Sequence, residues 1–171
     1  MHEMNHTTNV IGGTNYKFYN VRQNDLIRYT LKSIKEGSPV WFAGDVRKSF
    51  NPYYSTLDDK LEDTQIVFGD TRTFKKKDRM IFNNVQANHA MTIIGFNMDN
   101  KQNIINWQVE NSWGYWDSDV PGLDGFLNMS HSWFKKNVVQ VVIHKSILSR
   151  TVMKNVKNNE TKQIDPWVHV S

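Results

Sequence analysis

The chain has 171 residues, of which 39% are hydrophobic and 22% are charged, as in an ordinary globular protein long enough to form one domain. It contains no cysteine, so disulfide bonds, thiolate metal sites and a thiol nucleophile are excluded within these residues. The net charge of +4 does not indicate a nucleic-acid partner, because the lysines are dispersed and the cluster Lys75–Lys77 is followed at once by Asp78.

Nothing in the sequence indicates secretion or a membrane span. The first residues, Met1 to Asn5, lack the apolar core of a signal peptide. The longest strongly apolar stretch, Val138 to Ile143, is too short to cross a bilayer. We therefore expect a cytoplasmic protein without a membrane partner.

The first regular element expected in chain order is a helix from Asn24 to Lys35. Its apolar residues recur at helical spacing, at Leu26, Ile27, Leu31 and Ile34. Asn24 or Asp25 is expected to cap the start of this helix, and Gly37 followed by Pro39 is expected to end it.

The later elements are short and are separated by loops. Apolar runs and alternating patterns predict strands at 40–43, 91–96, 105–109, 125–129 and 138–144. Short helices are predicted at 75–82 and from a Ser130 cap through Lys136. Polar stretches predict an extended start over 1–15, loops over 51–70 and 113–125, and a polar tail from Ser149.

This order of elements predicts an α+β fold. We expect a mostly antiparallel sheet or partly closed barrel with short helices. The sequence shows no internal repeat and no second domain. The predicted organisation is an N-terminal extended segment (1–15), one domain (16–148) and a C-terminal tail (149–171).

The N-terminus contains a false metal motif. Residues 2–6 match the H-E-x-x-H pattern of zinc peptidases, in which a helix places both histidines on one face. Here the motif begins at the second residue, is followed by weak helix formers, and lacks a third ligand nearby. We therefore interpret His2 and His6 as a coincidence and predict no metal site.

His89 and Asn111 are the candidate catalytic residues. His89 comes just before one predicted strand, and Asn111 comes just after the next. If the two strands pair, both side chains emerge at the same end of the sheet. An imidazole can then exchange a proton with a nucleophile while the amide oxygen fixes its tautomer. By spacing alone, such residues are more often structural than catalytic.

Several collinear motifs between Val10 and Lys145 resemble the bleomycin hydrolase and aminopeptidase C branch of the papain-like cysteine peptidases. The histidine motif is N-H-A-M-T at 88–92, and the asparagine motif is W-Q-V-E-N-S-W-G at 107–114. Supporting stretches are V-I-G-G at 10–13 with Tyr19-Asn20, P-V-W-F-A-G-D-V at 39–46, G-F-L-N-M-S at 125–130 with Trp133-Phe134, and 138–143. Motifs in this order are far more specific than any one of them alone.

The resemblance implies a fold, a reaction and roles for residues. The fold would be the right-hand domain of a papain-like peptidase. The reaction would be amide hydrolysis of peptides by thiol acylation, without a metal or an organic cofactor. His89 would be the general base and acid, Asn111 its orienter, and Trp113 the indole that shields their hydrogen bond from water.

The chain departs from the family at the nucleophile. The family's cysteine lies roughly 130 residues or more upstream of the histidine, whereas only 88 residues precede His89 and none is cysteine. The glutamine of the oxyanion hole and the left-hand domain have no counterpart either. The family's C-terminus enters the cleft, but here the end at 166–171 lacks the usual small residues.

These departures leave three explanations open: a fragment, one half of a split enzyme, and a pseudoenzyme. We expect the chain alone to be inactive, and an active form to need a cysteine-bearing left-hand domain on the same or a separate chain. The competing interpretation is a non-catalytic binding or assembly module. Because the family forms hexameric rings, a homo-oligomer is also expected.

Overall fold

The structure is a computed structural model that describes residues 1–4, 11–47, 49–61, 66, 69, 74–115, 124–158 and 160–165. Two compact units are found, one formed by Met1–Tyr29 with His144–Ser171 and the other by Thr30–Ile143. The boundary between them falls inside helix α1 (Gln23–Lys35). Each unit is described by itself below, and the predicted segments 1–15, 16–148 and 149–171 stay a prediction.

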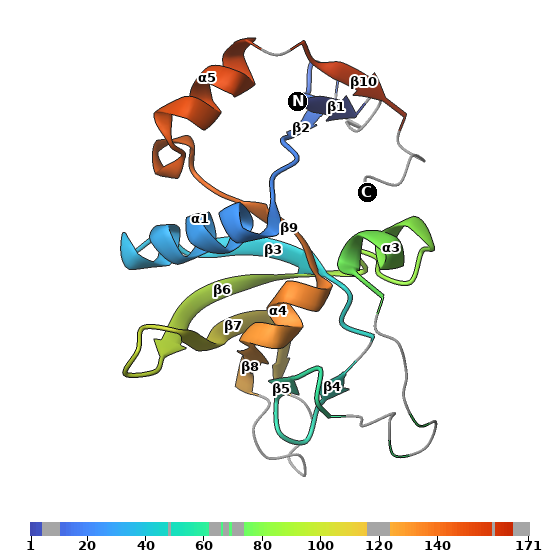
Figure 1. The fold of residues 1–171 in the computed structure, drawn as a ribbon, viewed down its shortest axis with the longest axis vertical. Coiled ribbons are helices and arrows are strands. Elements are labelled where there is room, and N and C mark those ends of the chain that lie inside the picture. The colour runs from blue at the N-terminus through green and yellow to red at the C-terminus, as the bar shows by residue number, and fades with distance from the viewer. Residues whose placement is uncertain are drawn as a thin grey trace. The chain divides into compact units, whose positions relative to one another are not determined.

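The unit Thr30–Ile143 is built on a seven-stranded sheet with the order β4-β5-β8-β7-β6-β3-β9 (Figure 1). The strands are β3 (Val40–Gly44), β4 (Phe50–Asn51), β5 (Thr56–Leu57), β6 (His89–Met98), β7 (Ile104–Tyr115), β8 (Asp124–Ser130) and β9 (Val138–Val142). Neighbouring strands are antiparallel except for the parallel pair β5–β8. The prediction of an α+β fold with a mostly antiparallel sheet is therefore confirmed.

The core of this unit follows from alternation along the strands. Trp107 and Val109 of β7 are fully buried, whereas their neighbour Gln108 is exposed. The helix α4 (His131–Asn137) packs on β7 and β8 (Figure 1). Its Phe134 ring stacks on the indole of Trp107 with centroids 5.0 Å apart. Burial of these large rings adds to the hydrophobic stabilisation that holds the sheet in place.

The helices of the sequence analysis are found, with one correction at a cap. Helix α1 begins at Gln23, so Asn24 and Asp25 lie in its first turn rather than at its cap. The carboxylate of Asp25 instead accepts a hydrogen bond from Arg28. The end of α1 is as predicted, because Gly37 adopts a positive φ of 78° that favours glycine. The short helix α3 (Lys76–Ile81) lies within the predicted range 75–82.

The predicted loop 51–70 is wrong in part. Its first residues form two short strands, β4 and β5, which join the edge of the sheet beside β8. Two-residue strands contain too few positions to show an alternating pattern, so the sequence carries no signal for them. The main strands β6 and β7 are also longer than predicted at both ends.

The unit of the two chain ends contains a small three-stranded sheet with the order β10-β1-β2. Its strands are β1 (His2–Met4), β2 (Tyr16–Phe18) and β10 (Lys162–Ile164). The same unit contains a 3-10 turn, η1 (Lys145–Ile147), and helix α5 (Arg150–Asn158), which precede β10 in the chain. The predicted extended start and polar tail therefore contain regular structure. The residues 166–171 lie outside the described part of the chain.

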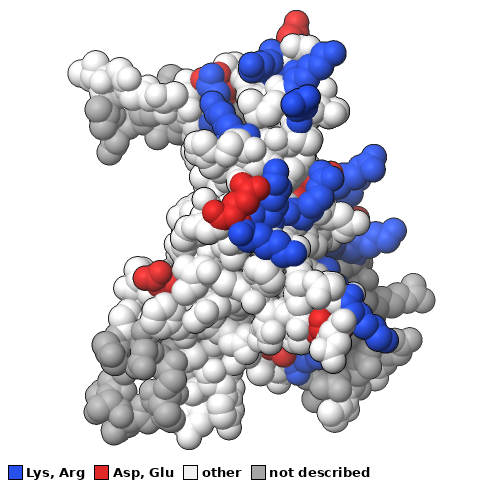
Figure 2. Space-filling model, turned by 90° about the vertical axis from the view of Figure 1, so that its left-hand side faces the viewer, with Lys and Arg blue, Asp and Glu red and all other residues white. Residues whose placement is uncertain are grey.

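Figure 2 shows Lys and Arg side chains on one face, several with an acidic side chain beside them. Exposed ion pairs include Arg28–Asp25 at 2.7 Å and Lys32–Glu36 at 3.7 Å. Such pairs contribute little to stability and are screened by salt. Within the described residues, no helix has the length and apolar character needed to span a membrane.

Candidate active site

His89 and Asn111 meet on the same face of the sheet. His89 is the first residue of β6, and Asn111 lies within β7. The Nε2 atom of His89 is 2.9 Å from Oδ1 of Asn111. The predicted contact between the two side chains is therefore confirmed. The positions differ from the prediction, since the residues lie inside the strands rather than beyond their ends.

The strand register explains why the two side chains meet. The register pairs Thr92 with Glu110 in antiparallel strands, so along both strands it sets His89 opposite Trp113. Asn111 and Trp113 are alternate residues of β7 and share a face with the buried Val109. His89 thus lies between a ring and an amide that the same strand presents.

The geometry at Asn111 makes it a firm partner for the imidazole. The residue is only 7% exposed, so water competes little for its amide. The β7–β8 pairing shifts between Glu110 and Tyr115, beside this residue. Gly125 of β8, with a φ of 81°, lies against this shift, and a Cβ there would come within 3.4 Å of the Asn111 backbone oxygen. The irregularity is typical of strands that direct a side chain into a site.

An aromatic ring covers the imidazole. The Trp113 ring centroid lies 4.7 Å from that of His89, with 33° between the planes. Phe50 of β4 approaches the same indole edge-on, with centroids 5.7 Å apart. The predicted packing of Trp113 beside the pair is confirmed. Its role as a shield of the hydrogen bond stays a prediction.

The arrangement leaves one ring nitrogen of His89 for chemistry. The Asn111 amide oxygen accepts a hydrogen bond only if His89 Nε2 carries the proton. The neutral imidazole then has its lone pair on Nδ1. A base whose tautomer is fixed by an uncharged amide can receive a proton at that nitrogen and return it later.

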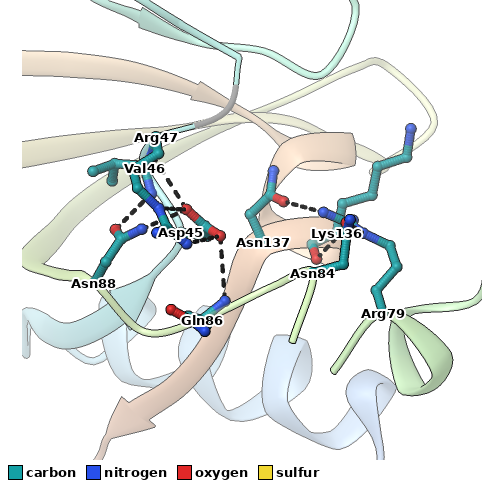
Figure 3. Close-up of polar contacts among 9 residues, drawn as sticks. All are labelled: Asp45, Val46, Arg47, Arg79, Asn84, Gln86, Asn88, Lys136 and Asn137. Atoms are coloured by element: carbon teal, nitrogen blue, oxygen red, sulfur yellow. Dashed lines mark hydrogen bonds and ion pairs between the residues drawn. The ribbon is translucent and has the colours of Figure 1, made fainter. Parts of the chain in front are cut away.

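A polar network beside His89 was missed by the sequence analysis. Asp45, directly after β3, has a fully buried side chain whose carboxylate accepts hydrogen bonds from Arg47, Gln86 and Asn88 (Figure 3). Burial acts to raise the pKa of Asp45, but the hydrogen bonds from Arg47, Asn88 and Gln86 outweigh it and hold the pKa below its usual value. A charged residue at the end of an apolar strand is the signal that could have found it.

A second group of polar contacts lies around Arg79 of α3 (Figure 3). Its guanidinium donates to Asn137 Oδ1 at 3.2 Å and to Asn84 Oδ1 at 3.3 Å. Lys76, one turn earlier, donates to the backbone oxygen of Val138. These bonds attach α3 to the junction of α4 and β9, beside the end of β3.

A groove of about 400 Å³ lies away from the candidate site. It is lined by the outward side of β7 and β8, including Gln108, Phe126 and Asn128, and by Tyr54. Neither His89 nor Asn111 lines it, because both belong to the opposite, inward set of strand residues.

The N-terminal histidine motif does not form a helix in its described residues. His2 and Glu3 belong to β1, and Glu3 accepts a hydrogen bond from Gln163 of β10. His6 lies outside the described part of the chain. Among the described residues there is no group of three or more histidine, aspartate or glutamate side chains that could hold a metal ion.

Comparisons with known proteins identify the family. The Peptidase C1-like family matches residues 1–171. The chain belongs to this family. It is 35% identical over 159 residues to aminopeptidase G of Lactobacillus delbrueckii subsp. lactis, which covers 93% of the chain and 35% of that protein. It is 31% identical over 156 residues to bleomycin hydrolase of Mus musculus, covering 90% of the chain and 33% of that protein.

A solved relative has the same fold. The crystal structure of PepW from Lactobacillus rhamnosis HN001 aligns with a TM-score of 0.87 and 28% identity, over 99% of this chain and 38% of that one. The chain thus spans about a third of the length of the curated relatives it matches. This family of papain-like cysteine aminopeptidases is the one that the sequence motifs indicated, yet the chain itself has no cysteine.

Proposed function

We propose that this chain supplies the catalytic histidine and asparagine of a cysteine aminopeptidase. The observation that supports the proposal is the 2.9 Å contact between His89 Nε2 and Asn111 Oδ1, with the Trp113 ring over the imidazole. In the proposal, the nucleophilic cysteine comes from a left-hand domain outside these 171 residues, on the same or a separate chain.

The proposed reaction is amide hydrolysis through an acyl-enzyme. His89 Nδ1 takes the proton of the cysteine thiol, and the thiolate adds to the carbonyl carbon of the scissile amide. The imidazolium then returns the proton to the leaving amine as the C–N bond breaks. A water molecule, deprotonated by the same nitrogen, releases the acyl group and restores the thiol. Asn111 keeps the ring in place throughout, by accepting from Nε2–H.

The proposal extends to substrate and surroundings. The substrates are peptides cleaved from their amino-terminal end, as the names of the related aminopeptidases suggest. No metal or organic cofactor takes part in the reaction as written. A cytoplasmic location and assembly into a homo-oligomer belong to the same proposal.

A second candidate function is favoured by one specific observation. None of the 171 residues is cysteine, and a catalytic unit without its nucleophile retains at most residual activity. The chain would then be a non-catalytic binding or assembly module with a peptidase fold.

The experiment compares the chain alone with the chain mixed with a separately expressed cysteine-bearing left-hand domain of a related aminopeptidase. The readout is hydrolysis of an aminoacyl fluorophore. We expect no hydrolysis by the chain alone and thiol-sensitive hydrolysis on mixing. His89→Ala should then lower the rate by about 100-fold or more. His144→Ala removes an exposed histidine and is the matched control that should leave the rate unchanged.

Two outcomes would count against the proposal. Tight binding of the two parts without hydrolysis would favour the assembly module. Hydrolysis by the chain alone that survives thiol-blocking reagents and is lost in His89→Ala would show that the mechanism is a different one.

A further inference from the structure

Asn88, the residue directly before the candidate base His89, makes three hydrogen bonds. The backbone N–H of Asn88 donates to the Gly44 oxygen at 3.1 Å. The Asn88 side-chain oxygen accepts from the Val46 backbone N–H at 3.0 Å, and its side-chain nitrogen donates to the Asp45 carboxylate. Figure 3 shows the two side-chain bonds of Asn88, to Val46 and to Asp45. Because Asn88 directly precedes His89, the three bonds restrain the backbone that leads into the histidine.

The Asp45 carboxylate is the centre of these contacts. Its Oδ2 accepts from the Gln86 backbone N–H at 3.2 Å and from Arg47 Nη2 at 3.1 Å. Its Oδ1 accepts from Arg47 Nε at 3.1 Å and from Asn88. A fully buried carboxylate is tolerated only when its oxygens are satisfied in this way. The partners Gln86 and Asn88 both lie in the segment that leads into His89.

From this geometry we propose that Asp45 is a positioning residue that acts on His89 through Asn88. The inference rests on the proposed function, in which His89 is the base. β3 and β6 pair Gly44 with His89, so Asp45 lies one residue beyond the histidine's own strand partner. The carboxylate fixes Asn88, the residue directly before β6, at the point where a strand would otherwise fray. The His89 ring therefore stays on Asn111 Oδ1 rather than rotating away.

A positioning residue is useful because the rate depends strongly on where the catalytic group lies. Displacement of a catalytic group by about 1 Å can cost on the order of 100-fold in rate. Asn111 fixes one ring nitrogen, but it cannot fix the backbone from which the ring projects. A buried carboxylate with fixed donors can do so, because its bonds are strong and charge-assisted.

A direct test measures the tautomer of the His89 imidazole by long-range ¹⁵N NMR of the 171-residue chain. We expect neutral His89 in the wild type to be mainly the Nε2–H tautomer. In Asp45→Asn, the ratio of the Nε2–H to the Nδ1–H tautomer of His89 should fall about fivefold. This is the factor that a neutral hydrogen bond, here the one from His89 to Asn111, provides. Asn88→Ala removes an exposed side chain, so the variant should fold, and it should give the same fall in the ratio. It therefore tests the proposal even if Asp45→Asn fails to fold.

The controls separate positioning from general stability. Asp99 is a carboxylate at the other end of the same β6–β7 hairpin, where it accepts from Lys101 and Asn103 backbone N–H groups. Asp99→Asn should leave the His89 tautomer ratio unchanged. The exchange variant Asp45→Asn with Asn88→Asp restores an amide–carboxylate bond in the reverse direction and should recover the ratio.

The outcomes distinguish the two proposals. If wild-type His89 is not mainly the Nε2–H tautomer, the proposed histidine–asparagine pair is wrong. If the wild type has that tautomer but neither Asp45→Asn nor Asn88→Ala lowers the ratio, only the positioning role of Asp45 is wrong. An equal fall in Asp99→Asn would also overturn it, because the effect would then be one of stability.

Discussion

At the residue scale, Lys76 shows how a half-buried charge opposes folding near neutral pH. Burial lowers the pKa of Lys76 to about 8 from its ordinary 10.5, and the charge of Arg79 acts in the same direction. Between these two values the unfolded chain binds a proton that the folded chain releases. The free energy of unfolding therefore gains a contribution that rises with pH in that window.

This linkage predicts a pH-dependent difference between the wild type and Lys76→Met. We expect the wild type to gain stability relative to Lys76→Met as the pH rises from about 8 towards 10.5, measured by urea unfolding at several pH values. Lys77→Met, at an exposed position of the same helix, should follow the wild type across the range. A gap that does not change with pH would show that partial burial does not lower the pKa of Lys76.

Gly44 is a second residue whose identity matters, because the backbone of Asn137 lies close to it. A Cβ added there would lie 2.8 Å from the backbone oxygen of Asn137, where β3 and β9 shift register. We expect Gly44→Ala to lower the free energy of unfolding by about 1–3 kcal/mol, the usual cost of overpacking. Gly95→Ala is the matched control, since its Cβ would meet side-chain atoms of Gln108 alone, with Oε1 at 3.3 Å and Cβ at 3.5 Å. Equal stabilities of the two variants, measured by thermal unfolding, would contradict this contact.

At the element scale, helix α4 depends on its N-cap residue, Ser130. The Ser130 side chain accepts a hydrogen bond from the Trp133 N–H at 3.1 Å, as the sequence predicted for a cap. Ser130→Ala should lower the free energy of unfolding by about 1 kcal/mol, whereas Ser130→Thr keeps the acceptor and should cost less. Because α4 carries the buried Trp133 and Phe134, tryptophan fluorescence during urea unfolding is a suitable measurement. A larger loss in the threonine variant would mean that packing, not capping, dominates at this position.

The elements that the sequence predicted are those with a clear period. Leu26, Ile27, Leu31 and Ile34 indicated α1, and the alternation around Trp107 indicated β7. Helix α5 was missed because its apolar residues, Val152, Met153 and Val156, are few within a polar stretch. Strands β1 and β10 were missed because they pair in parallel across almost the whole chain, and a three-residue strand carries no local signal of a distant partner.

The site was predictable to the extent that it is encoded in order along the chain. His89 and Asn111 were found from motifs, and their contact followed once two strands were expected to pair. The bonds of Asp45 could not be found in this way. Its partners Gln86 and Asn88 lie 41 and 43 residues away, so only the fold brings them to the carboxylate.

At the scale of the whole molecule, the two compact units differ in how deeply their strands are buried. In the unit Thr30–Ile143, the sheet contains fully buried residues such as Val40, Ile93 and Val109. In the other unit, every residue of β1, β2 and β10 is half-buried or exposed. Local opening needs less free energy where fewer apolar contacts are lost.

We therefore predict that the small sheet β10-β1-β2 opens before the seven-stranded sheet. By hydrogen exchange with mass spectrometry, the opening free energy of β1 amides should be lower than that of β6 and β7 amides by more than about 1 kcal/mol. Ile164→Ala, in β10, should speed exchange in β1 and β2 without changing β6, because the half-buried side chain belongs to the small sheet. Ile93→Ala removes a fully buried side chain from β6 and should speed exchange in β6 and β7, since such a cavity costs about 2–5 kcal/mol. If Ile164→Ala speeds exchange in β6 as much as in β1, the two sheets unfold together, and the difference in burial does not divide the chain into separate cooperative parts.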